Sequence, residues 1–299
     1  MSSPARYALA LNAIDGVGRV TINKLLTHFP TYDALKRYPR EQVLTRLKGV
    51  RQASDLVNTL FSAEAMAPHF ATADAELDAL RLKRVQVLVP GEHLWPSGLN
   101  DLAANQRPPY LYSYGPAPTL HLPKTALFAS PPLVDDSFEL AQTLVRLLLN
   151  YKTVPITSAW SGFDVVVGKL SDGAKLPSVL VADCGMMHIA PTVRPTVSLA
   201  VRNRGVLLSP FAMDHKPFDH DARERALVMA ALAQANVFID PQPKTPEWKA
   251  LEWSVAQQRP TFAIALSTTE LPSAVHRLYS ETDLEWVLLA LGLSTSDSA

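Results

Sequence analysis

The sequence predicts an α/β protein in which a small helix-hairpin-helix domain precedes a doubly wound parallel β-sheet. Two observations carry this prediction. Within the first 60 residues, two glycine turns are each flanked by apolar residues at helical spacing. From residue 124 onward, runs of five or six apolar residues alternate with helical stretches, which is typical of parallel strands covered on both faces. The length of 299 residues fits about two domains.

Composition excludes several functional classes. The 28 basic residues are balanced by 28 acidic ones, so a nucleic-acid partner would need a local basic patch. Glycine-rich phosphate loops need glycine for positive φ, and the chain has only 12 Gly against 24 Pro, which disfavours an intact dinucleotide site or P-loop. The single Cys184 allows neither an internal disulfide nor a thiolate zinc cluster.

We expect a cytoplasmic protein with no membrane partner and no cofactor or metal. The first residues lack the apolar core of a signal peptide, and the longest apolar stretch, at 286–293, is far shorter than the ~20 residues that a membrane span needs.

The N-terminal segment reads as two helical hairpins. Residues 7–29 form two short helical patterns around a Gly-Val-Gly turn, and residues 44–60 form a weaker copy. Such turns let backbone N–H groups at the start of the second helix hold a DNA phosphate. Nine basic and four acidic residues lie in the first 60, which supports this function. The predicted DNA-binding positions are Gly16, Gly18, Arg19, Lys24, Lys48, Gly49 and Arg51. The alternative is that the hairpins only pack or dock proteins.

The middle of the chain links the hairpins to the sheet. An alanine-rich stretch at 63–82 has helical spacing, and residues 85–89 read as a strand. Because Pro108 and Pro109 restrict their neighbours to extended geometry, residues 110–114 are predicted to form an edge strand or an extended arm.

Six strands of the sheet are predicted in chain order, with helices between them. The strands are 125–130, 154–158, 178–183, 205–209, 236–240 and 261–265, and the helices 137–150, 163–174, 192–203, 221–234 and 245–258. In such sheets ligands bind outside the carboxyl ends of the strands. The residues predicted to lie there are Ser130, Ser158 to Asp164, Asp183 to Gly185, Ser209 and Asp240 to Thr245.

Several motifs in this order resemble one family over roughly residues 7–270. They include P-P-Y-L-Y-S-Y-G at 108–115, A-D-C-G-M-M-H-I-A-P at 182–191 and G-V-L-L-S-P-F at 205–211. Together they resemble the DNA-processing protein A family, also called Smf. The resemblance implies a SAM-like helical domain and a Rossmann-like sheet domain. It also implies a non-enzymatic, homodimeric mediator that binds single-stranded DNA and loads a RecA-type recombinase in natural transformation.

On this basis we expect four segments: a hairpin domain at 1–62, a connecting helix and proline-rich arm at 63–123, the Rossmann-like domain at 124–270, and a C-terminal helix and tail at 271–299.

The chain departs from the family pattern where phosphate would bind. A family G-S-R reads Ala129-Ser130-Pro131, and Ser161 replaces a family arginine before Gly162. Phosphate recognition favours guanidinium groups, so we expect a rebuilt central pocket. The DNA-binding positions predicted in the sheet domain are Ser130, Ser158, Ser161, Gly162, Lys169, Arg202, Arg204 and Arg225. The alternatives are a nucleotide-sensing module or a protein-docking scaffold.

Three further groups of residues have chemical potential. His215, His220 and the nearby carboxylates at 214–221 contain metal-ligand types, but a solvated loop is the favoured interpretation. Cys184 with His188 suggests a nucleophile pair, and a packed thiol is favoured instead. Trp160 and Phe163 follow a strand, where an aromatic ring can stack on a base, and packing in the core is the equally plausible alternative.

Overall fold

A computed structural model describes residues 3–160, 162–265 and 270–293. The chain divides into two compact units. The first unit comprises Met1–Trp95 with Leu102–Ser113, and the second comprises Pro96–Asp101 with Tyr114–Ala299. Within the described ranges, no helix combines the length and apolarity needed to cross a bilayer.

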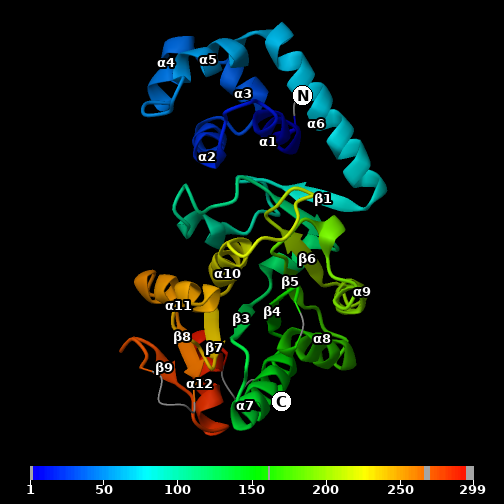
Figure 1. The fold of residues 1–299 in the computed structure, drawn as a ribbon, viewed down its shortest axis with the longest axis vertical. Coiled ribbons are helices and arrows are strands. Elements are labelled where there is room, and N and C mark those ends of the chain that lie inside the picture. Colours follow the sequence, from blue (N-terminus) through cyan, green and yellow to red (C-terminus); the bar gives the residue numbers. More distant parts are fainter. Residues whose placement is uncertain (1–2, 161, 266–269, 294–299) are drawn as a thin grey trace. The chain divides into compact units, whose positions relative to one another are not determined.

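The first unit is mainly helical (Figure 1). Its helices are α1 (Pro4–Asn12), α2 (Arg19–His28), α3 (Tyr32–Lys36), α4 (Arg40–Arg46), α5 (Ala53–Phe61) and α6 (Ala63–Leu82). The strands β1 (Val85–Leu88) and β2 (Leu111–Tyr114) are hydrogen-bonded neighbours. The two predicted hairpins and the helix at 63–82 are confirmed.

Side-chain caps and one buried face determine where these helices begin and how they pack. Ser3 accepts a hydrogen bond from the Arg6 amide at the start of α1, and Ser62 does the same for Ala65 at the start of α6. The α1 residues Tyr7, Leu9 and Leu11 are almost fully buried. The helices α1 and α6 pack together, and an Arg6–Asp74 ion pair of 2.6 Å joins them.

The second unit contains a doubly wound parallel sheet. Its strands are β3 (Lys124–Ala129), β4 (Val154–Ser158), β5 (Val179–Val181), β6 (Val206–Ser209), β7 (Ala235–Ile239), β8 (Thr261–Ile264) and β9 (His276–Arg277). Among the described residues they follow the order β6-β5-β4-β3-β7-β8-β9, and every pairing between them is parallel. The chain starts at β3 in the middle and adds strands first on one side and then on the other. The predicted fold class is confirmed.

Helices cover both faces of this sheet. They are α7 (Asp135–Asn150), α8 (Phe163–Gly173), α9 (Arg194–Arg202), α10 (Asp221–Leu232), α11 (Pro246–Ala256) and α12 (Glu285–Ala290), with short 3-10 turns at Ser97–Asp101, Ala117–His121, Met186–His188 and Thr282–Leu284. In the ribbon, α7, α8 and α9 lie on one side of the strands, and α10 packs with α11 on the other (Figure 1). Right-handed crossovers require this division, because the direction of winding reverses at β3.

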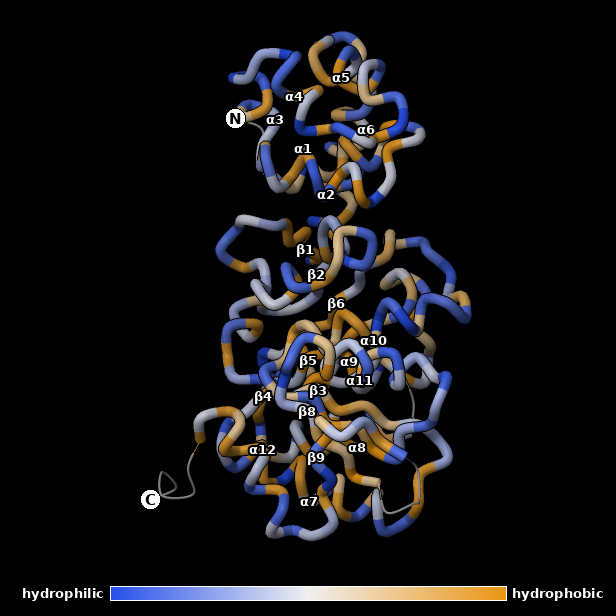
Figure 2. Tube along the Cα trace, turned by 90° about the vertical axis from the view of Figure 1, so that its left-hand side faces the viewer, coloured by the Kyte–Doolittle hydropathy of each residue, from blue (hydrophilic) through white to orange (hydrophobic). Residues whose placement is uncertain are grey.

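The core of the second unit explains why its strands read as continuous apolar runs. Leu127, Val237 and Ile264 are almost fully buried and pack with apolar residues of α7 and α12. Figure 2 shows hydrophobic colour concentrated along the strands and hydrophilic colour in the connecting turns. The carboxyl ends of the strands therefore present the polar residues that follow each apolar run.

Candidate nucleic-acid interface

The two hairpin turns of the first unit have the backbone conformation that the sequence predicts. Gly16 has φ of +77° and Gly49 has φ of +84°, and a Cβ at either position would meet nothing within 4 Å. Both residues are exposed, so glycine serves the conformation of the turn rather than close packing.

The helices that follow these turns begin without a side-chain cap. Gly18 precedes α2 and Gln52 precedes α5, and neither accepts a hydrogen bond from its helix through a side chain. The capping residue's side chain therefore occupies none of the first N–H groups in either helix, and the positive end of each helix dipole favours an anion there.

The two hairpins share one cavity. Its volume is about 110 Å³, and it is lined by Ile14, Asp15, Gly16, Val17, Thr21, Val50, Arg51, Gln52, Asp55, Leu56 and Thr59. Lys24 Nζ donates to the Lys48 carbonyl over 3.1 Å and so joins one hairpin to the other. Arg19 lies at the start of α2, where one guanidinium nitrogen is 3.5 Å from the Gln106 carbonyl. The structure thus brings the seven predicted hairpin positions into one region of the first unit.

The carboxyl edge of the sheet is occupied by an internal ion-pair network. Arg225 of α10 donates to Asp183, which follows β5, over 2.6 Å, and to Glu247 of α11 over 3.1 Å. The Arg225 side chain is only 9% exposed. Two carboxylates therefore neutralise this guanidinium, so it does not face solvent as a free cation.

Asp164 lies beside this network at the start of α8. The Ser158 hydroxyl, at the end of β4, donates a hydrogen bond to the Asp164 carboxyl group. Burial raises the pKa of Asp164 to about 7, although the Ser158 hydrogen bond and the nearby Arg225 charge act in the opposite direction.

Little free space remains at this edge. The cavity lined by Ser158, Asp164, Arg225 and Glu247 has a volume of about 10 Å³, which holds about one water molecule. The Ser130 hydroxyl and Arg225 Nε are buried and have no hydrogen-bond partner among the described residues. Arg225 lines this cavity, so a water there is the natural partner for its Nε, whereas a nucleotide would not fit without displacing the ion pairs.

The remaining sheet-domain positions do not join this network. Arg202 is the last residue of α9, and Arg204 lies two residues beyond it. Because α9 runs antiparallel to the strands, both residues lie toward the amino ends of the strands. Arg202 is also paired with Asp172 over 2.6 Å. Lys169 is exposed past the middle of α8. The basic residues of the second unit therefore do not form one continuous groove at the carboxyl edge.

Two predicted positions lie in the turn between β4 and α8. Gly162 is exposed with φ of +72° and precedes α8. Ser161 lies outside the described residues. In the same turn Trp160 is 54% exposed, whereas Phe163 is 4% exposed and belongs to the core. Of these two aromatic residues, only Trp160 is placed to contact a ligand.

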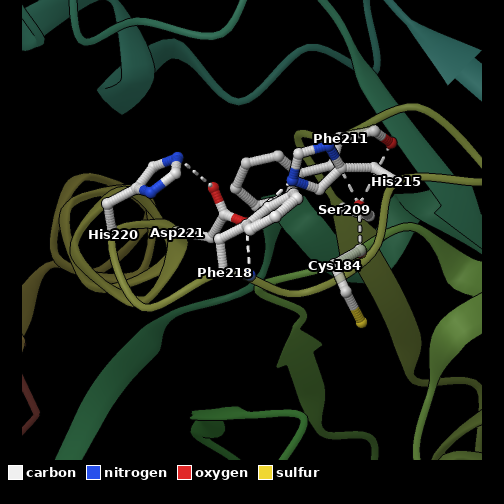
Figure 3. Close-up of polar contacts among 7 residues, drawn as sticks. All are labelled: Cys184, Ser209, Phe211, His215, Phe218, His220 and Asp221. Atoms are coloured by element: carbon white, nitrogen blue, oxygen red, sulfur yellow. Dashed lines mark hydrogen bonds and ion pairs between the residues drawn. The ribbon is translucent and has the colours of Figure 1, made fainter.

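The two other groups noted in the sequence have structural environments. Cys184 is buried, and burial raises the pKa of its thiol to about 11, as expected for a packed thiol. Around Asp221, the structure places His215 and His220 on one carboxylate (Figure 3). Within the described chain, no group of three or more His, Cys, Asp or Glu side chains has the arrangement of a metal site.

Sequence reasoning missed the partners of Arg225 and the aromatic stacking near Asp221. Phe211 stacks on His215, and Phe218 stacks on His220. A usable signal was present, because aromatic or histidine residues recur at 211, 215, 218 and 220.

These features define a class of protein. It combines a paired helix-hairpin-helix unit with a doubly wound parallel sheet whose carboxyl edge is polar but filled. The pattern of the family described as DNA recombination-mediator protein A matches residues 86–285, which is more than half of the chain. The chain belongs to this family, and the resemblance noted in its motifs is confirmed.

Two solved structures share the fold. DNA processing protein A from Streptococcus pneumoniae aligns with a TM-score of 0.64 at 14% identity, covering 90% of this chain and 98% of that one. DNA processing protein A from Helicobacter pylori aligns with a TM-score of 0.59 at 19% identity, covering 69% and 96%. The description of the H. pylori structure refers to a single-stranded DNA binding mode. Comparison with curated proteins gives no significant match.

Proposed function

We propose that this protein is a non-enzymatic, cytoplasmic recombination mediator that binds single-stranded DNA. Membership of the recombination-mediator family across residues 86–285 is the observation that carries the proposal. The H. pylori relative, which is described as binding single-stranded DNA, supports the choice of ligand. The partners that we propose are a RecA-type recombinase and a second copy of this chain, acting in natural transformation.

The paired hairpins are the proposed route to DNA phosphates. Lys48 and Arg51 are exposed near the shared cavity, and the uncapped starts of α2 and α5 belong to the same hairpins. Phosphate oxygens are well matched to such backbone N–H groups and cations. The buried Arg225 contributes to stability at the sheet edge rather than to phosphate binding.

In the second unit, a homodimer would use a surface other than the carboxyl edge of the sheet. A groove of about 800 Å³ lies beside β8, β9 and α12, and Phe262, His276, Trp286 and Leu289 are among its lining residues. Trp286 is 48% exposed and Leu289 is 63% exposed. Burying such side chains against a second copy removes apolar surface from water.

Fluorescence anisotropy with a labelled oligothymidylate tests the phosphate route. The wild-type protein is expected to bind the oligonucleotide, with an affinity that falls as salt rises. The double variant Lys48→Ala/Arg51→Ala is expected to bind more weakly. The slope of its log binding constant against log salt concentration should also be shallower, by about one unit for each phosphate that is no longer bound. A matched control is Lys152→Ala/Lys175→Ala, which removes two exposed lysines of the second unit. Equal weakening in both variants would contradict a specific role for the hairpins.

A further inference from the structure

Three helices on one face of the sheet are each followed by an exposed basic residue (Figure 1). Lys152 lies two residues beyond α7, Lys175 two beyond α8 and Arg204 two beyond α9, and we call these three residues the basic row. The strands β4, β5 and β6 begin within four residues of them and are neighbours in the sheet. Because these strands are parallel and lie about 4.8 Å apart, the basic row is gathered at the amino edge of the sheet.

The backbone of the basic row has a conformation that normally favours glycine. The φ angle is +56° at Lys152, +56° at Lys175 and +64° at Arg204. Glycine is the usual residue just after a helix, because a Cβ disfavours this left-handed conformation. The chain therefore accepts some backbone strain at three successive helix ends, and it carries a cation at each of them.

Stabilisation of the helix ends explains part of this pattern. The carboxyl end of a helix carries a partial negative charge, so a cation nearby is favourable. The helices on the other face of the sheet have the same dipole, yet Gln234 and Gln258 stand two residues beyond α10 and α11. The nearby cation Arg259 is only 15% exposed and is paired with Asp101 over 2.6 Å. The helix dipole alone therefore does not account for the exposed basic row.

The charges of the basic row are not neutralised by the part of the chain that the structure describes. Within that part, no hydrogen bond or ion pair involves the side chain of Lys152, Lys175 or Arg204. The neighbouring Arg202 differs, because it donates to Asp172 over 2.6 Å and so ties the end of α9 to the end of α8. The one carboxylate at these helix ends already has its cation, so the basic row is left to solvent.

An exposed leucine lies beside the basic row. Lys124 is 4% exposed, and its ammonium group donates over 2.7 Å to two backbone carbonyls, one of which belongs to Leu122. The Val154 amide donates to the Pro123 carbonyl over 2.8 Å, so the segment before β3 lies next to the segment that carries Lys152. Leu122 is 43% exposed there. The amino edge thus combines an aliphatic side chain with unpaired cations.

The surroundings of the basic row indicate which kind of partner it fits. Arg146 and Lys169 add two exposed cations, each four residues before the end of α7 or α8. Bases of a nucleic acid stack on aromatic rings, whereas Leu122 is aliphatic and packs best against apolar peptide side chains. A polypeptide that carries carboxylates and apolar side chains together therefore matches this edge better than a nucleic acid does.

We propose that the basic row, together with Leu122, is a docking surface for an acidic segment of a partner protein. Carboxylates of that segment pair with Lys152, Lys175 and Arg204, and an apolar side chain packs on Leu122. This surface uses none of the hairpin residues that are proposed to bind DNA. Because its charges are exposed, the interaction weakens as salt rises.

Fluorescence anisotropy of the full-length protein with a labelled peptide of Glu-Glu-Leu repeats tests this surface. The wild type should bind the peptide at low salt. The variant Lys152→Gln/Lys175→Gln/Arg204→Gln should bind it roughly 3- to 150-fold more weakly, which is the combined effect of losing three exposed ion pairs. Leu122→Ser should weaken binding of this peptide but not of a Glu-Glu-Ser repeat peptide of the same length.

A matched control removes the same set of charges at the opposite edge of the sheet. Lys216, Arg223 and Lys244 are exposed, and they lie in segments that follow the carboxyl ends of β6 and β7. Lys244 also has a positive φ of +71°. Lys216→Gln/Arg223→Gln/Lys244→Gln should bind the Glu-Glu-Leu peptide as the wild type does. Circular dichroism on each variant checks that the fold is retained.

The possible results separate this surface from other occupants. Absence of binding by the wild type at low salt overturns the proposal, and so does equal weakening in the two triple variants, because the attraction would then be general. If the variant of the basic row loses oligothymidylate binding to the same extent, the edge is a nucleic-acid site instead. If that variant loses dimerisation in sedimentation velocity, the occupant is a second copy of this chain. Both of these results also overturn the docking surface, and none of the failures bears on DNA binding by the hairpins.

Discussion

At the scale of single residues, the main finding is that an arginine expected to bind DNA is held by two carboxylates. The prediction for Arg225 rests on the family resemblance, and its partners Asp183 and Glu247 lie 42 and 22 residues away. Their approach depends on the crossovers that place α10 and α11 beside β5, so no local pattern reveals it. The serines at the same edge were predictable, because each lies at the carboxyl end of an apolar strand or directly after it.

Replacing Arg225 tests whether it stabilises the fold. Arg225→Ala leaves two carboxylates without their cation in a buried site, and such a change costs about 3–5 kcal/mol. The matched control is Arg202→Ala, since the Arg202–Asp172 pair has the same 2.6 Å distance but the Arg202 side chain is 65% exposed. Exposed pairs contribute little, so this control should hardly change stability. Urea unfolding of both variants gives the comparison, and equal midpoints would contradict the structural role.

The raised pKa of Asp164 predicts a pH dependence with a definite sign. Burial raises this pKa from 3.8 to about 7, so the folded state binds the proton more tightly than the unfolded state. The stability contributed by this group is fully present below pH 3.8 and is lost as pH rises toward and through 7. Asp164→Asn removes that pH-dependent decrease. At pH 8 the free energy of unfolding of the variant should therefore exceed that of the wild type by an amount on the order of 2–4 kcal/mol.

The measurement is urea unfolding of the wild type and Asp164→Asn at pH 4.5 and at pH 8. Near-equal stability is expected at the lower pH, since the wild-type carboxyl is then protonated. Equal stability at both pH values would show that Asp164 does not titrate in this way.

At the scale of elements, the strands were predictable and the apolar groove beside α12 was not. Parallel strands buried on both faces need apolar side chains at successive positions, so each strand of the sheet from β3 to β8 appears as an apolar run. The two-residue strand β9 has no such pattern, and its position depends on pairing with β8. The groove beside β9 and α12 therefore becomes visible only in three dimensions.

A substitution in α12 tests whether this groove is the dimer face. Leu289→Asp introduces a charge into the apolar groove, which an interface core excludes. In sedimentation velocity the wild type should sediment as a dimer and the variant should shift toward monomer. Leu82→Asp is the control, because Leu82 is 88% exposed in the first unit. A monomeric wild type, or an unchanged dimer in Leu289→Asp, would contradict the assignment.

At the scale of the whole molecule, the proposed anion-binding surfaces lie one in each unit. The chain has no net charge, yet its first 60 residues carry nine basic and four acidic side chains. The carboxyl edge of the sheet has few glycines and a closed ion-pair network in place of a phosphate pocket, and the basic row lies at the opposite edge. The hairpin turns were predictable because glycine turns are local, whereas the basic row is formed from three separate helix ends that only the folded sheet brings together.

A competition measurement with the wild-type protein tests whether it prefers single-stranded DNA to duplex. A labelled oligothymidylate is bound first, and unlabelled single strands or the corresponding duplex are then titrated in at the same salt concentration. Because a duplex hides its base faces in the stack, single strands should displace the probe at much lower concentration than duplex. Equal displacement by duplex, or no binding of the probe at low salt, would show that the protein is not a single-stranded DNA binder.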